Sequence, residues 1–113
     1  MNIEDIRNYV LSKEAVTEGF PFGEDTLVFK TNQKIFLLAG LDELSLSINL
    51  KCDPEKAIQF REDYPDNIFP GYHMNKKHWN TLLLDGKLKN SLIKELIDHS
   101  YSLVFKPKKT KAV

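Results

Sequence analysis

The chain has 113 residues, of which 16 are Lys or Arg and 16 are Asp or Glu, so its formal net charge is zero. This length predicts one domain, and 42% hydrophobic residues are enough for a core that needs no disulfide. No apolar stretch approaches the roughly 20 residues of a membrane span, and the N-terminus is acidic, so we expect neither a membrane protein nor a secreted one. The single cysteine, Cys52, excludes an internal disulfide, and we expect a cytoplasmic protein.

The first half of the chain predicts one helix followed by three strands. Ile3, Ile6 and Val10 recur at helical spacing, which indicates a helix over residues 3–13. A turn-rich segment, 17–25, follows. Three short runs rich in β-branched and aromatic residues then predict strands at 27–31, 34–39 and 46–51, the first two joined by a hairpin turn. In the third run, Ser47, Asn49 and Lys51 alternate with apolar residues, so we expect one apolar sheet face and one wet face.

The second half predicts a helix, two strands and a final helix. Asp53 is a good capping residue and Pro54 suits a first helical turn, so a helix begins there and extends to residue 64. Strands are predicted at 68–73 and 79–84, and a helix at 90–105, capped by Asn90 or Lys89. The resulting order, α-β-β-β-α-β-β-α, indicates an α+β fold with the terminal helices on one face of an antiparallel sheet. We expect a single domain over residues 1–105 and a basic, flexible tail over 106–113.

Charge is distributed unevenly along the chain. Residues 1–105 carry 12 Lys or Arg against 16 Asp or Glu, a net charge of −4. Three windows, 26–41, 44–52 and 67–84, contain no acid and hold five lysines: Lys30, Lys34, Lys51, Lys76 and Lys77. These windows coincide with the predicted strands, which indicates a basic sheet face on an otherwise acidic domain. The alternative is that strands avoid acids in any protein.

The densest group of polar and aromatic residues lies at 71–81. It combines two lysines, two histidines, two asparagines and two aromatic residues without an acid. Lysines bind phosphates, and asparagine and histidine side chains offer polar contacts, so this hairpin is a candidate recognition element. The predicted site residues are Asn49, Lys51, His73, Asn75, Lys76, Lys77 and His78. The alternative is a tight turn anchored in the core, and for Trp79 and Met74 we expect burial.

Enzymatic motifs are missing from the sequence. It has no phosphate-binding glycine loop, paired-acid motif or serine elbow, so we do not expect an enzyme. Three histidines and one cysteine lack the paired spacing of a zinc site, and we expect no metal and no cofactor. Cys52 precedes the middle helix, whose N-terminal field would lower its pKa, but we favour a buried, inert thiol. Catalysis through Cys52 or His73 is the weakest alternative, and His99 is expected to be structural.

Five separated blocks of sequence carry a resemblance to a known family. They are VTEGFPFG at 16–23, TLVFK at 26–30, NLKCDP at 49–54, GYHMNKKHWNT at 71–81 and ELIDHSY at 95–101. Together they resemble the bacterial MmcQ/YjbR family. The resemblance implies a CyaY-like α+β fold and DNA binding through a "double wing" arrangement. It does not bring iron binding, which needs an acidic ridge that these strands lack. We expect Phe20, Pro21, Phe22 and Gly23 to form a rigid aromatic turn that closes the core beneath the sheet.

Two functional hypotheses follow. The first is a non-enzymatic protein that binds double-stranded DNA, with Lys51, Lys76 and Lys77 on phosphates and with His73, Asn75 and His78 in polar contacts. The second is a module that binds a small anion or a protein partner through Asn49, Lys51, His73, Lys76 and His78 on the same face. The oligomeric state does not follow from the sequence.

Overall fold

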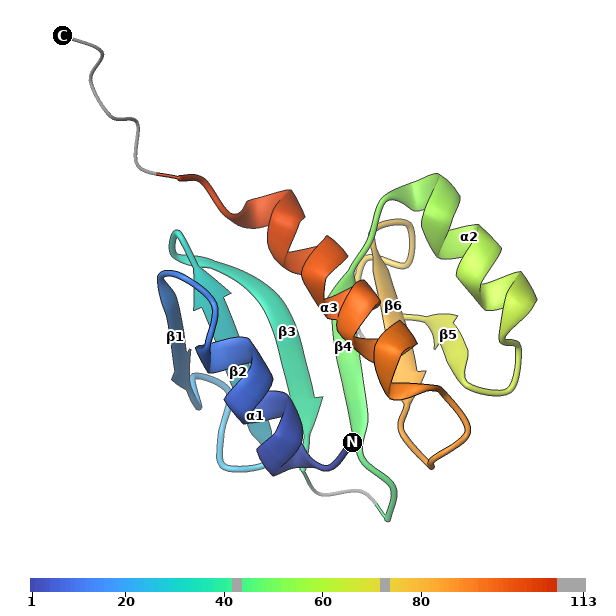
Figure 1. The fold of residues 1–113 in the computed structure, drawn as a ribbon, viewed down its shortest axis with the longest axis horizontal. Coiled ribbons are helices and arrows are strands. Elements are labelled where there is room, and N and C mark those ends of the chain that lie inside the picture. Colours follow the sequence, from blue (N-terminus) through green and yellow to red (C-terminus); the bar gives the residue numbers. More distant parts are fainter. Residues whose placement is uncertain (42–43, 72–73, 108–113) are drawn as a thin grey trace, which may run out of the picture.

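The computed structural model describes residues 1–41, 44–71 and 74–107. Within these residues, three helices and six strands follow one another along the chain (Figure 1). In order, they are α1 (Ile3–Leu11), β1 (Val16–Gly19), β2 (Thr26–Thr31), β3 (Lys34–Gly40), β4 (Ser47–Lys51), α2 (Pro54–Asp63), β5 (Ile68–Pro70), β6 (Trp79–Leu83) and α3 (Asn90–Val104).

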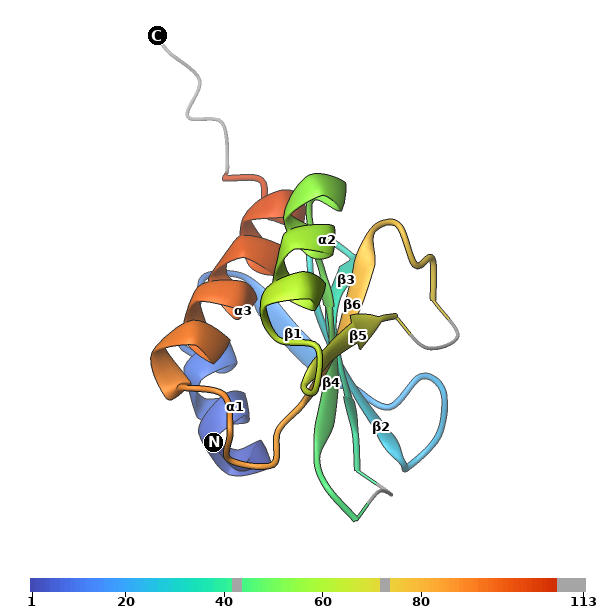
Figure 2. The ribbon, with the colours of Figure 1, turned by 90° about the vertical axis from the view of Figure 1, so that its right-hand side faces the viewer.

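The strands form one antiparallel sheet, in the order β1-β2-β3-β4-β6-β5. The helices lie together on one side of this sheet (Figure 2). Helix α3 lies across the central strands β3 and β4, α1 lies over the β1–β2 end of the sheet, and α2 contacts β5 and β6 at the other edge. The α+β class and the placement of both terminal helices on one face are thus confirmed. None of the described helices combines the length and the apolar character needed to cross a bilayer.

The core lies between the sheet and α1 and α3. Alternating strand residues face it, except that the consecutive residues Phe36 and Leu37 of β3 both belong to the core, where the β2–β3 register shifts. The helices contribute Ile6 and Val10 from α1 and Ile93 and Ile97 from α3. In β4 the core-facing residues are Ile48 and Leu50, so the predicted alternation of this strand is confirmed. Each fully buried aliphatic side chain contributes roughly 1.5–3 kcal/mol of transfer free energy.

Helix starts follow local capping chemistry. Asn2 and Asp5 form a capping box at α1, and the Asp53 carboxylate accepts the backbone N–H groups of Glu55 and Lys56 at α2. The N-cap of α3 is Lys89, which makes no side-chain capping bond. Asn90 is the first residue of α3, and its side-chain oxygen accepts a hydrogen bond from the Met1 amine at 3.3 Å.

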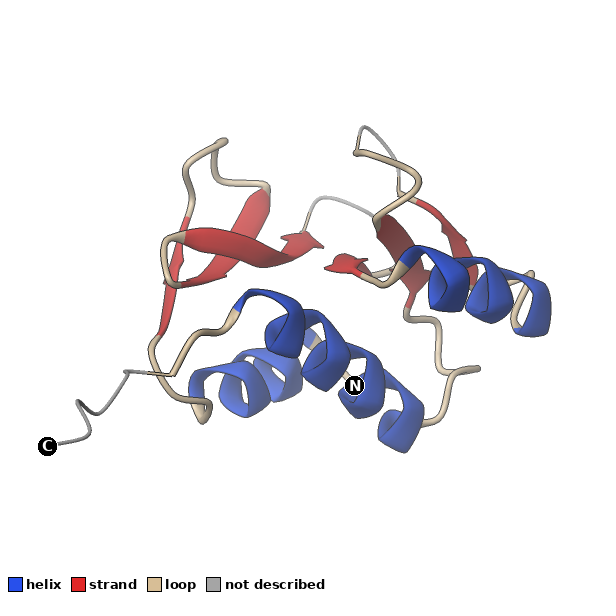
Figure 3. Ribbon diagram, turned by 90° about the horizontal axis from the view of Figure 1, so that it is seen from above, coloured by secondary structure: helices blue, strands red, loops and turns tan. Residues whose placement is uncertain are grey.

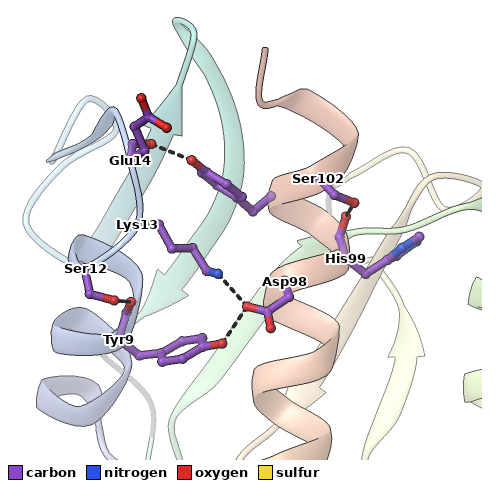
Figure 4. A network of polar contacts seen from close by, with 8 residues as sticks. Tyr9, Ser12, Lys13, Glu14, Asp98, His99 and Ser102 are labelled. Atoms are coloured by element: carbon purple, nitrogen blue, oxygen red, sulfur yellow. Dashed lines mark hydrogen bonds and ion pairs between the residues drawn. The ribbon is translucent and has the colours of Figure 1, made fainter. Parts of the chain in front are cut away.

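A polar network joins α1 and its following turn to α3 (Figure 4). The Asp98 carboxylate accepts a hydrogen bond from the Tyr9 hydroxyl at 2.6 Å and pairs with the Lys13 ammonium at 2.5 Å. Burial and this carboxylate raise the pKa of Tyr9 to about 12. The Tyr101 hydroxyl donates to the Glu14 carbonyl, 2.5 Å away. These contacts fix the two terminal helices relative to each other, although 89 residues separate Tyr9 from Asp98.

Strand β1 lies in the segment predicted to be turn-rich. Its four residues pair with β2, from Val16 opposite Thr31 to Gly19 opposite Val28. It is an edge strand whose residues are exposed or only partly buried. Its stability therefore comes from pairing with β2, and no local pattern in the sequence predicts that pairing. The predicted strand at 68–73 ends at Pro70, a residue that cannot donate a ladder hydrogen bond.

The aromatic turn at residues 20–23 does not close the core, and this prediction is wrong. Phe20 is 50% exposed and Phe22 is 66% exposed. The loop joining β1 to β2 projects from the side of the sheet opposite the helices, so no described helix is in position to cover it (Figure 2).

Candidate functional site

The sheet face turned away from the helices, which we call the open face, carries no helix among the described residues (Figure 3). Because directly opposed residues of paired strands share a face, the register identifies its members. One row of residues crosses all six strands, and from edge to edge it reads Gly19, Val28, Leu38, Asn49, Thr81 and Phe69.

On the open face, the charged residues that belong to described strands are two lysines. Lys30 stands opposite Thr17 on β1 and Ile35 on β3, and Lys51 stands opposite Trp79 on β6. Two strand spacings, roughly 10 Å, separate β2 from β4. Both lysines are partly exposed, and neither forms an ion pair with a carboxylate in the part of the chain that the structure describes. This face is therefore positively charged.

Asn49 is held in place on the open face. Its side-chain oxygen accepts a hydrogen bond from the Thr81 hydroxyl at 2.5 Å. Its two N–H donors make no hydrogen bond within the part of the chain that the structure describes, so they are available to a ligand. The structure thus brings Asn49 and Lys51 together on one strand face, as their alternation in the sequence predicts.

Two loops project on the same side as the open face, one on each flank (Figures 2 and 3). The first joins β1 to β2 over residues 20–25. The second joins β5 to β6, and of it the structure describes Gly71 and residues 74–78; we call it the 71–78 loop. Asn75, Lys76 and Lys77 are exposed on the second loop. The Asn75 carboxamide accepts the backbone N–H of Lys77 at 3.0 Å, so this side chain shapes the turn that presents the lysines. His73 lies outside the described residues.

Backbone contacts fasten the base of the 71–78 loop to the sheet. The His78 carbonyl accepts the Cys52 N–H at 2.7 Å, which links the loop to the end of β4. The Gly71 N–H donates to the Trp79 carbonyl at 2.8 Å. A Cβ on Gly71 would stand 2.7 Å from the Trp79 Cβ, so this close approach requires glycine.

Trp79 and Met74 are half-buried rather than buried, which corrects the prediction that both lie in the core. Trp79 points to the open face because it pairs with Lys51, and the core-facing neighbours on β6 are Asn80 and Leu82. A partly exposed indole beside a lysine gives this face an aromatic surface as well as charge.

Cys52 is buried, as predicted. Burial first and the Asp53 charge second raise the pKa of its thiol to about 11, which agrees with the favoured inert thiol and not with the alternative of a thiolate at the helix N-terminus. His99 accepts the Asp53 N–H at Nε2, 3.1 Å away, and so links α3 to the start of α2. Burial lowers the pKa of His99, which keeps the ring neutral and able to accept this bond. Among the described residues, no three His, Cys, Asp or Glu side chains come together in a way that would hold a metal ion.

The prediction of site residues missed Lys30, Thr81 and the exposed Phe20. Within the predicted strand 27–31, alternation alone places Lys30 on the same face as Val28. That face could be recognised as the open one only from the register with β3 and β4, which joins Val28 to Leu38 and Leu38 to Asn49.

Similarity to known proteins identifies the family. The family model for YjbR matches residues 11–103. The chain belongs to the YjbR family. It is 42% identical to YbdF of Escherichia coli O157:H7 over 75% of this chain and 69% of that protein. It is 31% identical to YjbR of Escherichia coli K12 over 89% of this chain and 85% of that protein.

A solved structure of a YjbR relative shares the whole fold. The crystal structure of the Deinococcus radiodurans protein DR2400 superposes with a TM-score of 0.88 at 38% identity, covering 97% of this chain and 83% of that one. A crystal structure of a Pseudomonas syringae protein gives a TM-score of 0.80 at 31% identity, covering 93% of this chain and all of that one. YbdF and YjbR are described as uncharacterized proteins, so the comparisons establish family and fold and leave function to be argued from the site.

Proposed function

We propose that this YjbR protein is a non-enzymatic module that binds double-stranded DNA through the open face and the 71–78 loop. The observation that carries the proposal is the placement of four lysines, Lys30, Lys51, Lys76 and Lys77, on one side of the sheet. None of them is paired with a carboxylate in the described part of the chain. A surface of this kind attracts a polyanion although the whole chain has no net charge.

The site residues divide between phosphate and polar contacts. Lys76 and Lys77 are exposed and Lys51 is partly buried, so we expect Lys76 and Lys77 to contact phosphates first and Lys51 to contact them when the duplex lies against the sheet. The Asn49 amide donors, His73, Asn75 and His78 supply hydrogen bonds to sugar, phosphate or base edges. Because so few phosphates are neutralised, the affinity is modest and falls steeply with salt.

Duplex binding measured at about 50 and 200 mM salt tests the proposal. Lys76→Ala/Lys77→Ala is expected to weaken binding and to reduce the slope of log affinity against log salt by about 2, one for each lost phosphate contact. The matched control is Lys56→Ala/Lys94→Ala, which removes the same charge from α2 and α3 on the helix side. Equal weakening by both double variants would indicate net charge alone, and unchanged binding by Lys76→Ala/Lys77→Ala would remove the proposed site.

The second candidate is a small anion or a protein partner bound by the same face. The Asn49 donors beside the unpaired Lys51 favour it, because an amide and an ammonium together suit a single anionic group. Thermal unfolding with duplex DNA, phosphate or citrate separates the two candidates. Stabilisation by a small anion but not by DNA would favour the second.

A further inference from the structure

A cavity of about 410 Å³ lies beside the 20–25 loop, at the β1–β2 end of the open face. It is lined by Thr17, Gly19, Val28 and Lys30 from the two strands and by Phe20 and Pro21 from the loop. The register places all four strand residues on the open face. Its volume falls within the roughly 300–1,000 Å³ range of small-molecule sites.

The unpaired charge among the residues that line this cavity is the positive charge of Lys30. Glu18 also lines the cavity, but its carboxylate accepts two hydrogen bonds from Arg7 Nε, at 2.7 and 2.9 Å. This ion pair neutralises the acid, whereas Lys30 has no such partner in the described structure. The cavity therefore attracts an anion.

The loop adds an aromatic surface. Phe20 is half exposed although a phenyl ring gains free energy on burial, and Phe22 beside it is more exposed still. On the strand side, no heavy atom lies within 4 Å of the position that a Cβ on Gly19 would take. An exposed ring, an open backbone position and a lysine suit a flat ligand that carries a phosphate.

We propose that this cavity is a stacking subsite that takes one unpaired nucleobase, with the adjoining phosphate on Lys30. This inference rests on the proposed function, because the duplex on Lys51 and the 71–78 loop supplies the neighbouring nucleotides. The roughly 10 Å between β2 and β4 corresponds to about three nucleotides at 3.4 Å each. One strand leaving the end of a duplex can thus reach from Lys51 to Lys30.

In this proposal the 71–78 loop and the 20–25 loop contact different parts of the nucleic acid. The 71–78 loop exposes two lysines, whereas the 20–25 loop exposes Phe20 and Phe22 together with Glu24 and Asp25. Two carboxylates repel phosphates, so the 20–25 loop does not act as a second phosphate clamp. It holds a base by its rings and leaves the phosphate to Lys30.

A comparison of a blunt duplex with the same duplex carrying a single-stranded thymidine tail tests this subsite. The tail is expected to raise the affinity about tenfold, within the range measured for one stacked base. Phe20→Ala removes the ring, and Gly19→Val fills the cavity without a forbidden backbone angle. Both are expected to abolish the gain from the tail, measured for each variant against its own affinity for the blunt duplex. Tyr64→Ala, which removes an exposed aromatic side chain at the end of α2, is the matched control and keeps the gain.

The outcomes separate the subsite from the proposed function. Equal affinity for tailed and blunt duplexes, or a gain that survives both Phe20→Ala and Gly19→Val, would overturn the subsite while duplex binding stands. If the blunt duplex does not bind, the proposed function fails. Binding of a free oligothymidine strand then tests the subsite separately. Binding of that strand that Phe20→Ala weakens supports it, and absence of binding overturns it.

Discussion

Ser100 bridges the backbones of β3 and β4 at the point where these two strands stop pairing directly. The paired register of β3 and β4 reaches Leu37 opposite Leu50. At the next position, the fully buried Ser100 hydroxyl donates to the Phe36 carbonyl at 2.6 Å and accepts the Lys51 N–H at 2.9 Å. One side chain of α3 therefore fixes the backbone of a lysine in the candidate site.

Ser100→Ala is expected to lower the free energy of unfolding by about 2–4 kcal/mol, because two buried backbone groups lose their partner at once. Urea denaturation measures the change. Ser102→Ala is the matched control, since that hydroxyl is exposed and bonds within α3 to the His99 carbonyl. A loss below about 0.5 kcal/mol for Ser100→Ala, the range of ordinary surface changes, would show that water replaces the hydroxyl.

His99 makes stability depend on pH. Burial, and after it the Lys56 charge, lowers its pKa from 6.5 in the folded state. The unfolded chain then binds the proton more tightly, so stability is complete above pH 6.5 and falls as the pH drops through the lower folded pKa. We expect the melting temperature of the native protein to fall over this window and that of His99→Gln to fall less. Parallel curves for the two proteins would contradict this role.

At the scale of elements, the β5–β6 hairpin depends on Gly71. Gly71→Ala forces the new methyl group against the Trp79 Cβ and carbonyl, so the loop must shift. The expected cost is about 1–3 kcal/mol of stability, as for other overpacked positions, together with weaker duplex binding because Lys76 and Lys77 move. Gly19→Ala is the control, since its methyl group meets no atom within 4 Å. Duplex affinity that survives Gly71→Ala would show that the loop position does not matter.

The elements with strong internal patterns could be predicted from the sequence. Strands β2, β3 and β4 alternate or concentrate apolar residues, and α2 begins with Asp53 and Pro54, so their positions follow from local chemistry. Strand β1 could not be predicted, because pairing with β2 stabilises its polar residues. The same distinction holds at the site. Alternation places Asn49 and Lys51 on one face, but no local pattern indicates the side of the sheet from which residues 20–25 project.

At the scale of the whole molecule, a neutral chain has paired charges on the helix side of the sheet and unpaired lysines on the open face. On the helix side, Asp98 is paired with Lys13, and Glu18 is paired with Arg7. On the open face, Lys30 and Lys51 lack carboxylate partners in the described structure. A polyanion is therefore expected to approach in one orientation, with the open face toward it.

The four lysines at 106, 108, 109 and 111 bring the net charge of the chain from −4 to zero. Replacing all four with glutamine is expected to weaken duplex binding and to reduce the salt slope by up to about 0.9 for each lysine that neutralises a phosphate. We expect stability to stay the same, because all four lysines follow α3 in the sequence and Lys106, the one within the described residues, is exposed. The matched control replaces them with arginine, which keeps the charge and should keep the slope. An unchanged slope in the glutamine variant would assign duplex binding to the open face and the 71–78 loop alone.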